Sequence, residues 1–285
     1  MIEIGSDEHK ERFCRQFVAS HRHYRPESLA WPELDPAALE RLRAIPFWPE
    51  VLHTERRAGA IVDAYAATIA DPVVREAVAL QGFEEARHAD FLRLMISRYG
   101  IATDERPLEP PRRNPYRAFA DFGYGECLDS FLGFGVFVIA RRAGFLPAAM
   151  FELLDTLLRE ETRHIVFFID WMAWHQATRG RGTAWWRGGV AAGYYGRAIG
   201  RLAATIRHGR AANGGRDFSA TQAGVFLDGF TWRGLVEACV VEHTRRMADF
   251  DPALLRPRLL PWAGGVALAG MRLAAAVPRR RSGAA

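Results

Sequence analysis

Two short stretches of this sequence place carboxylates and an imidazole at helical spacing. Residues 84–88 read Glu-Glu-Ala-Arg-His, and residues 160–164 read Glu-Glu-Thr-Arg-His. In a helix, a Glu and a His three positions apart lie on one face about one turn apart, so both can bind the same metal ion. Two such helices facing each other would surround two metal ions. The pairs are Glu85 with His88 and Glu161 with His164.

Two further glutamates have the spacing that such a site needs. Two divalent ions require more negative ligands than the motifs supply, and helix bundles of this kind add one carboxylate from each of two further helices. Glu55 stands 30 residues before Glu85, and Glu126 stands 35 residues before Glu161, which suits antiparallel helices joined by a turn. The predicted metal ligands are Glu55, Glu85, His88, Glu126, Glu161 and His164.

A single Glu-x-x-His on a helix is most often a solvated surface pair. Here both copies lie on faces that are otherwise apolar, with Val78 and Leu92 around the first and Leu157 and Phe168 around the second. Unpaired charges would be costly to bury there. The repeat therefore favours a metal site over a surface pair and over a metal-free structural bundle.

The residues around the motifs predict an all-α fold. Apolar residues recur at helical spacing over about 48–70, 73–99, 116–143 and 148–174, and no strand-type alternation competes with them. A proline-rich connection over 101–117 separates the first pair of segments from the second. This is the connectivity of a ferritin-like four-helix bundle with one long crossover.

Further helices are expected on both sides of the bundle within one helical domain, residues 1–285. Residues 46–175 would form the four-helix, metal-binding core, residues 1–45 an N-terminal wrap with a short helix around 12–21, and residues 176–285 a helical extension. The extension is predicted to contain a turn at 213–215, one or two helices within 221–250 and an apolar tail over 259–277. The tail is expected to cover the bundle, with contact to a membrane surface as the alternative.

Composition excludes several other classes of protein. The net charge is +5, but basic and acidic residues are interspersed, which is typical of a solvated surface and not of a nucleic-acid-binding platform. Cys14, Cys127 and Cys239 are far apart and form no zinc-binding or disulfide pattern, so a reducing cytoplasm is expected. The first residues are acidic and unlike a signal peptide, and no uninterrupted apolar run reaches the ~20 residues that cross a bilayer.

The repeated motif, each copy preceded by a lone helical Glu, resembles the ferritin-like carboxylate-bridged diiron proteins. That superfamily includes the soluble methane and toluene monooxygenase hydroxylases, acyl-carrier-protein desaturases, rubrerythrins and arylamine N-oxygenases, and the resemblance covers residues 46–175. It implies two iron ions, with Mn/Fe occupancy left open. It also implies that Glu55 and Glu126 bind one iron each, that Glu85 and Glu161 can bridge the two irons, and that His88 and His164 each complete the coordination of one iron.

The resemblance implies roles for the neighbouring residues as well. Glu84 and Glu160 would accept a hydrogen bond from the ligand histidine of the opposite half, and Arg87 and Arg163 would balance their charges. The alternative is that all four form solvent-facing salt bridges. Ser130 occupies the position of an oxygen-side threonine in the monooxygenase hydroxylases.

Two features of the third segment bear on the site from spacing alone. Asp129 lies three positions after Glu126 and could replace or supplement it, although Glu126 is preferred. Four glycines indicate a local bulge or a cavity beside the metals: Gly123, Gly125, Gly133 and Gly135. Phenylalanines of the third and fourth segments fit either an apolar pocket or ordinary core: Phe122, Phe131, Phe134, Phe137, Phe167 and Phe168.

The expected function is that of an O2-activating non-haem diiron oxygenase or oxidase. Hydroxylation, desaturation or N-oxygenation of a small or lipid-like organic substrate would fit, with O2 and an external electron donor as partners. The alternative is a ferroxidase or iron-handling protein. A cytoplasmic location, with peripheral membrane contact through the tail, and a homodimer complete the expectations.

Overall fold

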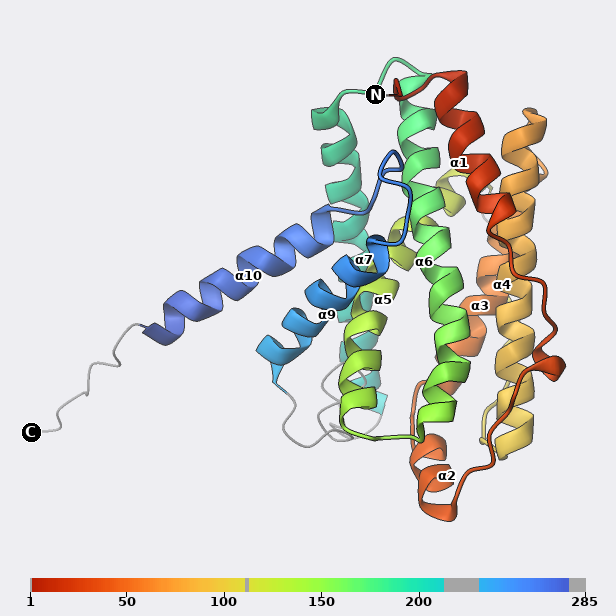
Figure 1. Ribbon diagram of the computed structural model, residues 1–285, viewed down its shortest axis with the longest axis vertical. Coiled ribbons are helices and arrows are strands. Elements are labelled where there is room, and N and C mark those ends of the chain that lie inside the picture. The colour runs from red at the N-terminus through yellow and green to blue at the C-terminus, as the bar shows by residue number, and fades with distance from the viewer. Residues whose placement is uncertain (1, 111–112, 213–230, 277–285) are drawn as a thin grey trace, which may run out of the picture.

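The computed structural model describes residues 2–110, 113–212 and 231–276, and this part of the chain is helical without strands (Figure 1). The all-α bundle expected from the sequence is therefore confirmed. The helices are α1 (Asp7–Ala19), α2 (Pro36–Arg43), α3 (Trp48–Ala66), α4 (Pro72–Tyr99), α5 (Pro115–Arg142), α6 (Ala148–Ala177), α7 (Ala184–Ala212), α9 (Trp232–Met247) and α10 (Leu259–Ala276), with a 3-10 turn η1 (Pro26–Ser28).

Local sequence sets the ends of the central helices. The Asp71 carboxylate accepts hydrogen bonds from the backbone N–H groups of Val73 and Val74, and Pro72 occupies the first turn, where its missing N–H costs nothing. Gly100 ends α4 with a left-handed backbone, φ 58°. The four predicted segments thus match α3 to α6 to within a few residues.

Helices α3 to α6 form the bundle that positions the two motifs. α3 packs along α4 and α5, α5 packs along α6, and α4 and α6 face each other at a wider separation. α1 lies across both α4 and α6. The wider α4–α6 separation leaves room for the motif side chains, which project from these two helices.

The N-terminal wrap runs along the outside of the α4–α6 pair (Figure 1). α1 begins at Asp7, earlier than expected, because Ser6 caps it by accepting a hydrogen bond from the His9 N–H. After α1 the chain is irregular apart from η1, and it reaches α2 beyond the far end of α4. This segment, residues 20–35, is called the strap below.

The glycines of α5 do not produce the local bulge that the sequence indicated. α5 is an uninterrupted α-helix. A side chain at Gly123 would overlap the ring of Phe168, and one at Gly135 would lie 2.9 Å from the backbone nitrogen of Cys239 on α9 and closer to its sulfur. Gly123 and Gly135 permit close packing, and Phe168 belongs to the hydrophobic core.

The C-terminal extension packs against the outside of α5. α7 and α9 both contact α5, and α10 packs on α9. The turn predicted at 213–215 and the start of the helix predicted from 221 lie outside the described residues.

The apolar tail forms a helix but covers little of the bundle. Leu260, Gly264 and Leu268 of α10 are buried on one face, whereas Trp262 and Leu273 on the opposite face are exposed. Figure 1 shows α10 extending away from the other helices. The buried face of α10 packs mainly on α9 and also contacts α5 and α7, so the expectation that the tail covers the bundle is right for this face alone.

One described helix is long and apolar enough to cross a membrane when length and composition are the only criteria. This helix is α5, and 56% of its most apolar window is buried inside the protein. α5 also carries Glu126 toward the bundle interior. The burial is that of a core helix.

Gly135→Ala should destabilise the fold by about 1–3 kcal/mol, because the added methyl group overlaps α9 at Cys239. Gly133→Ala on the same helix meets nothing within 4 Å and should be neutral or stabilising by about 0.5–1 kcal/mol. Urea unfolding of both variants measures the difference. Equal stability of the two variants would contradict the close α5–α9 contact.

Candidate metal centre

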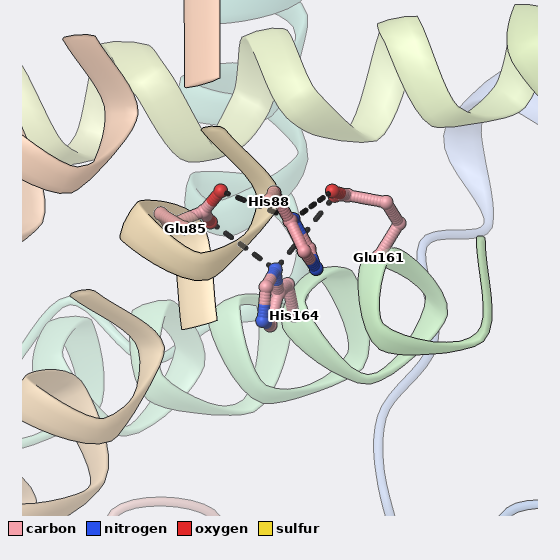
Figure 2. Close-up of side chains that lie close together, drawn as sticks. All are labelled: Glu85, His88, Glu161 and His164. Carbon is pink, nitrogen blue, oxygen red and sulfur yellow. Dashed lines mark ion pairs between the residues drawn. The ribbon is translucent and has the colours of Figure 1, made fainter. Parts of the chain in front are cut away.

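The two motifs meet at the centre of the bundle. Helices α4 and α6 bring the rings of His88 and His164 to a centroid separation of 5.5 Å, and both side chains are fully buried. One ligand atom each of Glu85, His88, Glu161 and His164 lies within 4.8 Å of the others, and the four side chains point toward one another (Figure 2).

Each motif glutamate reaches both histidines. Glu161 places one carboxylate oxygen 2.9 Å from His88 Nδ1 and the other 3.7 Å from His164 Nδ1. Glu85 does the reverse, with 3.1 Å to His164 Nδ1 and 3.8 Å to His88 Nδ1. Both carboxylates therefore stand where they could bridge two positions, one beside each histidine.

The other two helices of the bundle supply the outer carboxylates. Glu55 of α3 lies 3.5 Å from His88 Nδ1, and Glu126 of α5 lies 3.3 Å from His164 Nδ1. The structure thus brings together all six residues predicted as ligands, in two sets related by an approximate two-fold.

Gln81 was not predicted as a member of this group. It lies one turn before Glu85 on α4 and donates hydrogen bonds to Glu85 at 3.2 Å and to Glu126 at 3.5 Å. A buried amide at i−4 from a predicted ligand was the signal available in the sequence. Its amide holds carboxylates from two helices in place.

The donor atoms fit a pair of divalent cations. His88 Nδ1, His164 Nδ1 and Glu126 Oε1 are buried and have no hydrogen-bond partner. Unpaired buried donors and acceptors are costly, and a metal ion would satisfy all three. Four carboxylates and two imidazoles also match the charge and ligand preferences of two divalent transition metals.

The six side chains Glu55, Glu85, His88, Glu126, Glu161 and His164 are called the cage below. Their pKa shifts also show that positive charge is favourable at the centre of this group. Burial lowers the pKa of His88, but the nearby carboxylates of Glu160, Glu161 and Glu55 outweigh this effect and raise the pKa well above its usual value. The pKa of His164 is raised in the same way, against burial, by Glu85 and Glu126. Without metal, protons on the two imidazoles therefore supply the positive charge.

The pKa values of the two outer carboxylates are also raised, which for a carboxyl group favours the neutral form. Burial raises the pKa of Glu55 to about 8, although its contact with His88 lowers it. Burial, together with the charges of Glu85 and Glu161, raises the pKa of Glu126 well above its usual value. The cage thus resists holding four negative charges unless cations enter.

Behind each histidine stands the glutamate of the opposite motif. His88 Nε2 lies 2.9 Å from Glu160, and His164 Nε2 lies 2.9 Å from Glu84. An ionised carboxylate only accepts hydrogen bonds, so each Nε2 carries the proton and each Nδ1 is left to face the cage. This is the cross-pairing that the resemblance implied.

The arginines follow the same crossed pattern. Arg87 donates to Glu160 and Arg163 donates to Glu84, both at 2.8 Å. The contacts with His164 and Arg163 hold the pKa of Glu84 far below its usual value, against the effect of burial. All four side chains are buried, so the alternative of solvent-facing salt bridges is wrong.

Asp129 and Ser130 stand apart from the ligand set. Glu126, and not Asp129, is within contact distance of His164. Asp129 is exposed, yet crowding desolvates it and raises its pKa to about 6, against the effect of Arg201. Ser130 is buried one turn beyond Glu126, and among the described residues it makes no hydrogen bond with the cage.

The glutamates around the two histidines differ in exposure. The side chains of Glu55 and Glu161 are 16% and 15% exposed, whereas those of Glu84 and Glu160 on the opposite side are fully covered. α1 and the strap lie on the covered side. Sequence reasoning did not find the strap's contribution, because its irregular chain has no periodicity to read.

Comparisons with family models, curated proteins and solved structures find no match for this chain. The chemistry of the site is therefore argued from its own residues.

Metal binding should weaken as the pH falls. A protonated imidazole cannot bind metal, and His88 and His164 keep their protons to an unusually high pH, so metal ions must displace them. The Co2+ affinity should fall about tenfold per pH unit for each displaced proton between pH 8 and pH 6. Calorimetric titration in buffers of different ionisation enthalpy measures the Co2+ affinity and the number of protons released. An affinity independent of pH, with no proton release, would show that the imidazoles are not ligands.

Proposed function

We propose that this protein is an O2-activating non-haem diiron oxidoreductase of the oxygenase or oxidase type. The observation that carries the proposal is the arrangement of Glu85 and Glu161, each of which offers one oxygen to the space beside each buried histidine. Such an arrangement serves two metal ions better than one. Glu55, Glu85, His88, Glu126, Glu161 and His164 would hold two iron ions there, which in the reduced state would supply the electrons for activating O2 toward C–H or N–H bonds.

The one-sided exposure supports a reactive centre over a purely structural one. Structural metal sites are enclosed by protein ligands, whereas catalytic sites keep positions open. Here the partly exposed Glu55 and Glu161 mark the side from which O2 and an organic substrate can arrive. The covered side holds the histidines in place and excludes water.

The residues of the chain divide the remaining work. Glu84 and Glu160 fix the tautomer and orientation of the two imidazoles, and the paired arginines neutralise them. Asp129, which is exposed, is the proposed group that exchanges protons with solvent. Ser130 is the proposed oxygen-side hydroxyl.

The substrate class that fits this proposal is a small or lipid-like organic molecule. Oxygenation of such a molecule consumes electrons, which we assign to a separate cytoplasmic reductase or to the substrate itself. Iron handling, as in a ferroxidase, is the competing function, and it would need the same ligands but no organic substrate.

Glu161→Ala should lower the iron content from about two ions per chain to one or fewer, since Glu161 lies beside both histidines. Glu152→Ala, an exposed position on the same helix, is the matched control and should keep the iron. Iron content is measured by elemental analysis. O2 consumption is measured in the presence of a reductant and a panel of aliphatic and aromatic substrates. The proposal is supported if wild type and Glu152→Ala show substrate-dependent O2 uptake and Glu161→Ala does not. Iron mineral without organic product would indicate iron handling, and unchanged iron in Glu161→Ala would exclude the site.

We also propose that α10 touches a membrane surface. Its exposed face is apolar, with Trp262, Val266 and Leu273 at helical spacing. Arg258 precedes the helix, Arg272 lies near its end, and the sequence continues with three further arginines, which suits anionic headgroups. Such contact would give a lipid-like substrate a short route to the protein.

The triple variant Trp262→Ser, Val266→Ser, Leu273→Ser should lose cosedimentation with anionic vesicles that wild type shows. Val241→Ser, an exposed apolar position on α9, is the control and should keep it. Vesicles of neutral lipid should bind less than anionic ones. Wild type that stays in the supernatant with both lipids, or dimerises through this face in sedimentation experiments, would contradict the proposal.

A further inference from the structure

The charged groups behind the two histidines depend on the strap for their outer contacts. Glu84, Glu160, Arg87 and Arg163 lie on the covered side of the cage and are buried. Their inner contacts go to the histidines and to one another. Their remaining hydrogen-bonding capacity is directed outward, where the end of α1 and the strap pass (Figure 1).

Backbone carbonyls of this N-terminal segment fix both arginines. Arg163 donates to the carbonyl of Phe17 at 2.7 Å and to the hydroxyl of Ser20 at 2.9 Å. Arg87 donates to the carbonyl of Arg22 at 2.8 Å, and its guanidinium lies 4.1 Å from the centre of the Tyr24 ring. Each arginine is therefore clamped between a motif glutamate and the N-terminal segment.

Two side chains of the strap contact the glutamates directly. Tyr24 donates its hydroxyl hydrogen to Glu160 Oε2 at 3.0 Å, and the same oxygen accepts the hydrogen bond from His88 Nε2. His21 Nδ1 lies 2.5 Å from Glu84 Oε1, so its N–H donates to the ionised carboxylate that also accepts from His164. The strap thus supplies one extra donor to each of the two histidine-holding glutamates.

We propose that Tyr24 and His21 are positioning residues of the metal centre, which act on the metals through Glu160–His88 and Glu84–His164. Tyr24 restricts the carboxylate that orients His88, and His21 restricts the one that orients His164. Loss of either donor removes one of the contacts that hold the carboxylate and leaves its arginine and histidine partners in place. The carboxylate then orients the imidazole less strictly. The metal position beside that histidine then binds more weakly. This inference rests on the proposed metal centre, but on no particular reaction.

The shared strap distinguishes this role from ordinary packing. Tyr99 of α4 also ties the strap down, because its hydroxyl donates to the carbonyl of Pro32 at 2.7 Å, but no contact leads from Tyr99 to the cage among the described residues. Tyr24→Phe and Tyr99→Phe each remove one hydroxyl that anchors the same segment. Only the first removes a contact to a histidine-holding glutamate.

The test is a Co2+ titration of wild type, Tyr24→Phe and Tyr99→Phe, followed by visible absorption and with the thermal midpoint of each metal-free protein as a second readout. Tyr24→Phe should lower the affinity of one Co2+ position by about tenfold and shift its absorption bands. Tyr99→Phe should change the metal-free thermal midpoint to a similar extent but leave affinity and bands unaltered. Equal Co2+ behaviour of the two variants would overturn the inference.

A second pair of variants tests the other half. His21→Leu should weaken one Co2+ position, whereas His21→Asn, whose amide can donate from nearly the same place, should restore most of the affinity. Equal affinities for His21→Leu and wild type would also overturn the inference. Wild type that binds no Co2+ or Fe2+ would instead refute the proposed metal centre, so the two failures are distinguishable.

Discussion

Four carboxylates and two imidazoles buried in one helical bundle are the constraint to which the rest of this structure responds. Like charges so close together in a medium of low dielectric repel strongly, and burial alone disfavours each ionised form. The molecule balances them in two layers. In the inner layer, metal ions or protonated imidazoles balance the four carboxylates. In the outer layer, Arg87 and Arg163 balance Glu160 and Glu84, which lie behind the histidines.

These layers give the cage a front and a back. At the front, the side chains of Glu55 and Glu161 are partly exposed to solvent. At the back, the strap and α1 close the α4–α6 interface and leave no exposed charge on Glu84 or Glu160. The hydrogen bonds that orient the imidazoles are thus concentrated on the covered side.

The features that could be predicted from the sequence are those carried by helical periodicity. Prolines, glycines and apolar spacing fixed α3 to α6, and the i, i+3 spacing of Glu and His placed both ligand pairs on inward faces. The contacts of the strap could not be predicted, because His21 and Tyr24 reach partners 63 and 136 residues away from a segment without regular structure. The role of the α5 glycines was misread, since only the structure shows how closely Phe168 and Cys239 approach.

The crossing of partners between the two halves has a consequence for folding. Glu84 and Glu160 make their shortest ion pairs with the histidine and arginine of the other half, and the contact of Glu84 with Arg87 of its own half is longer, at 3.7 Å. A separated half would leave these buried charges without their closest partners. Folding of one half is therefore coupled to docking of the other.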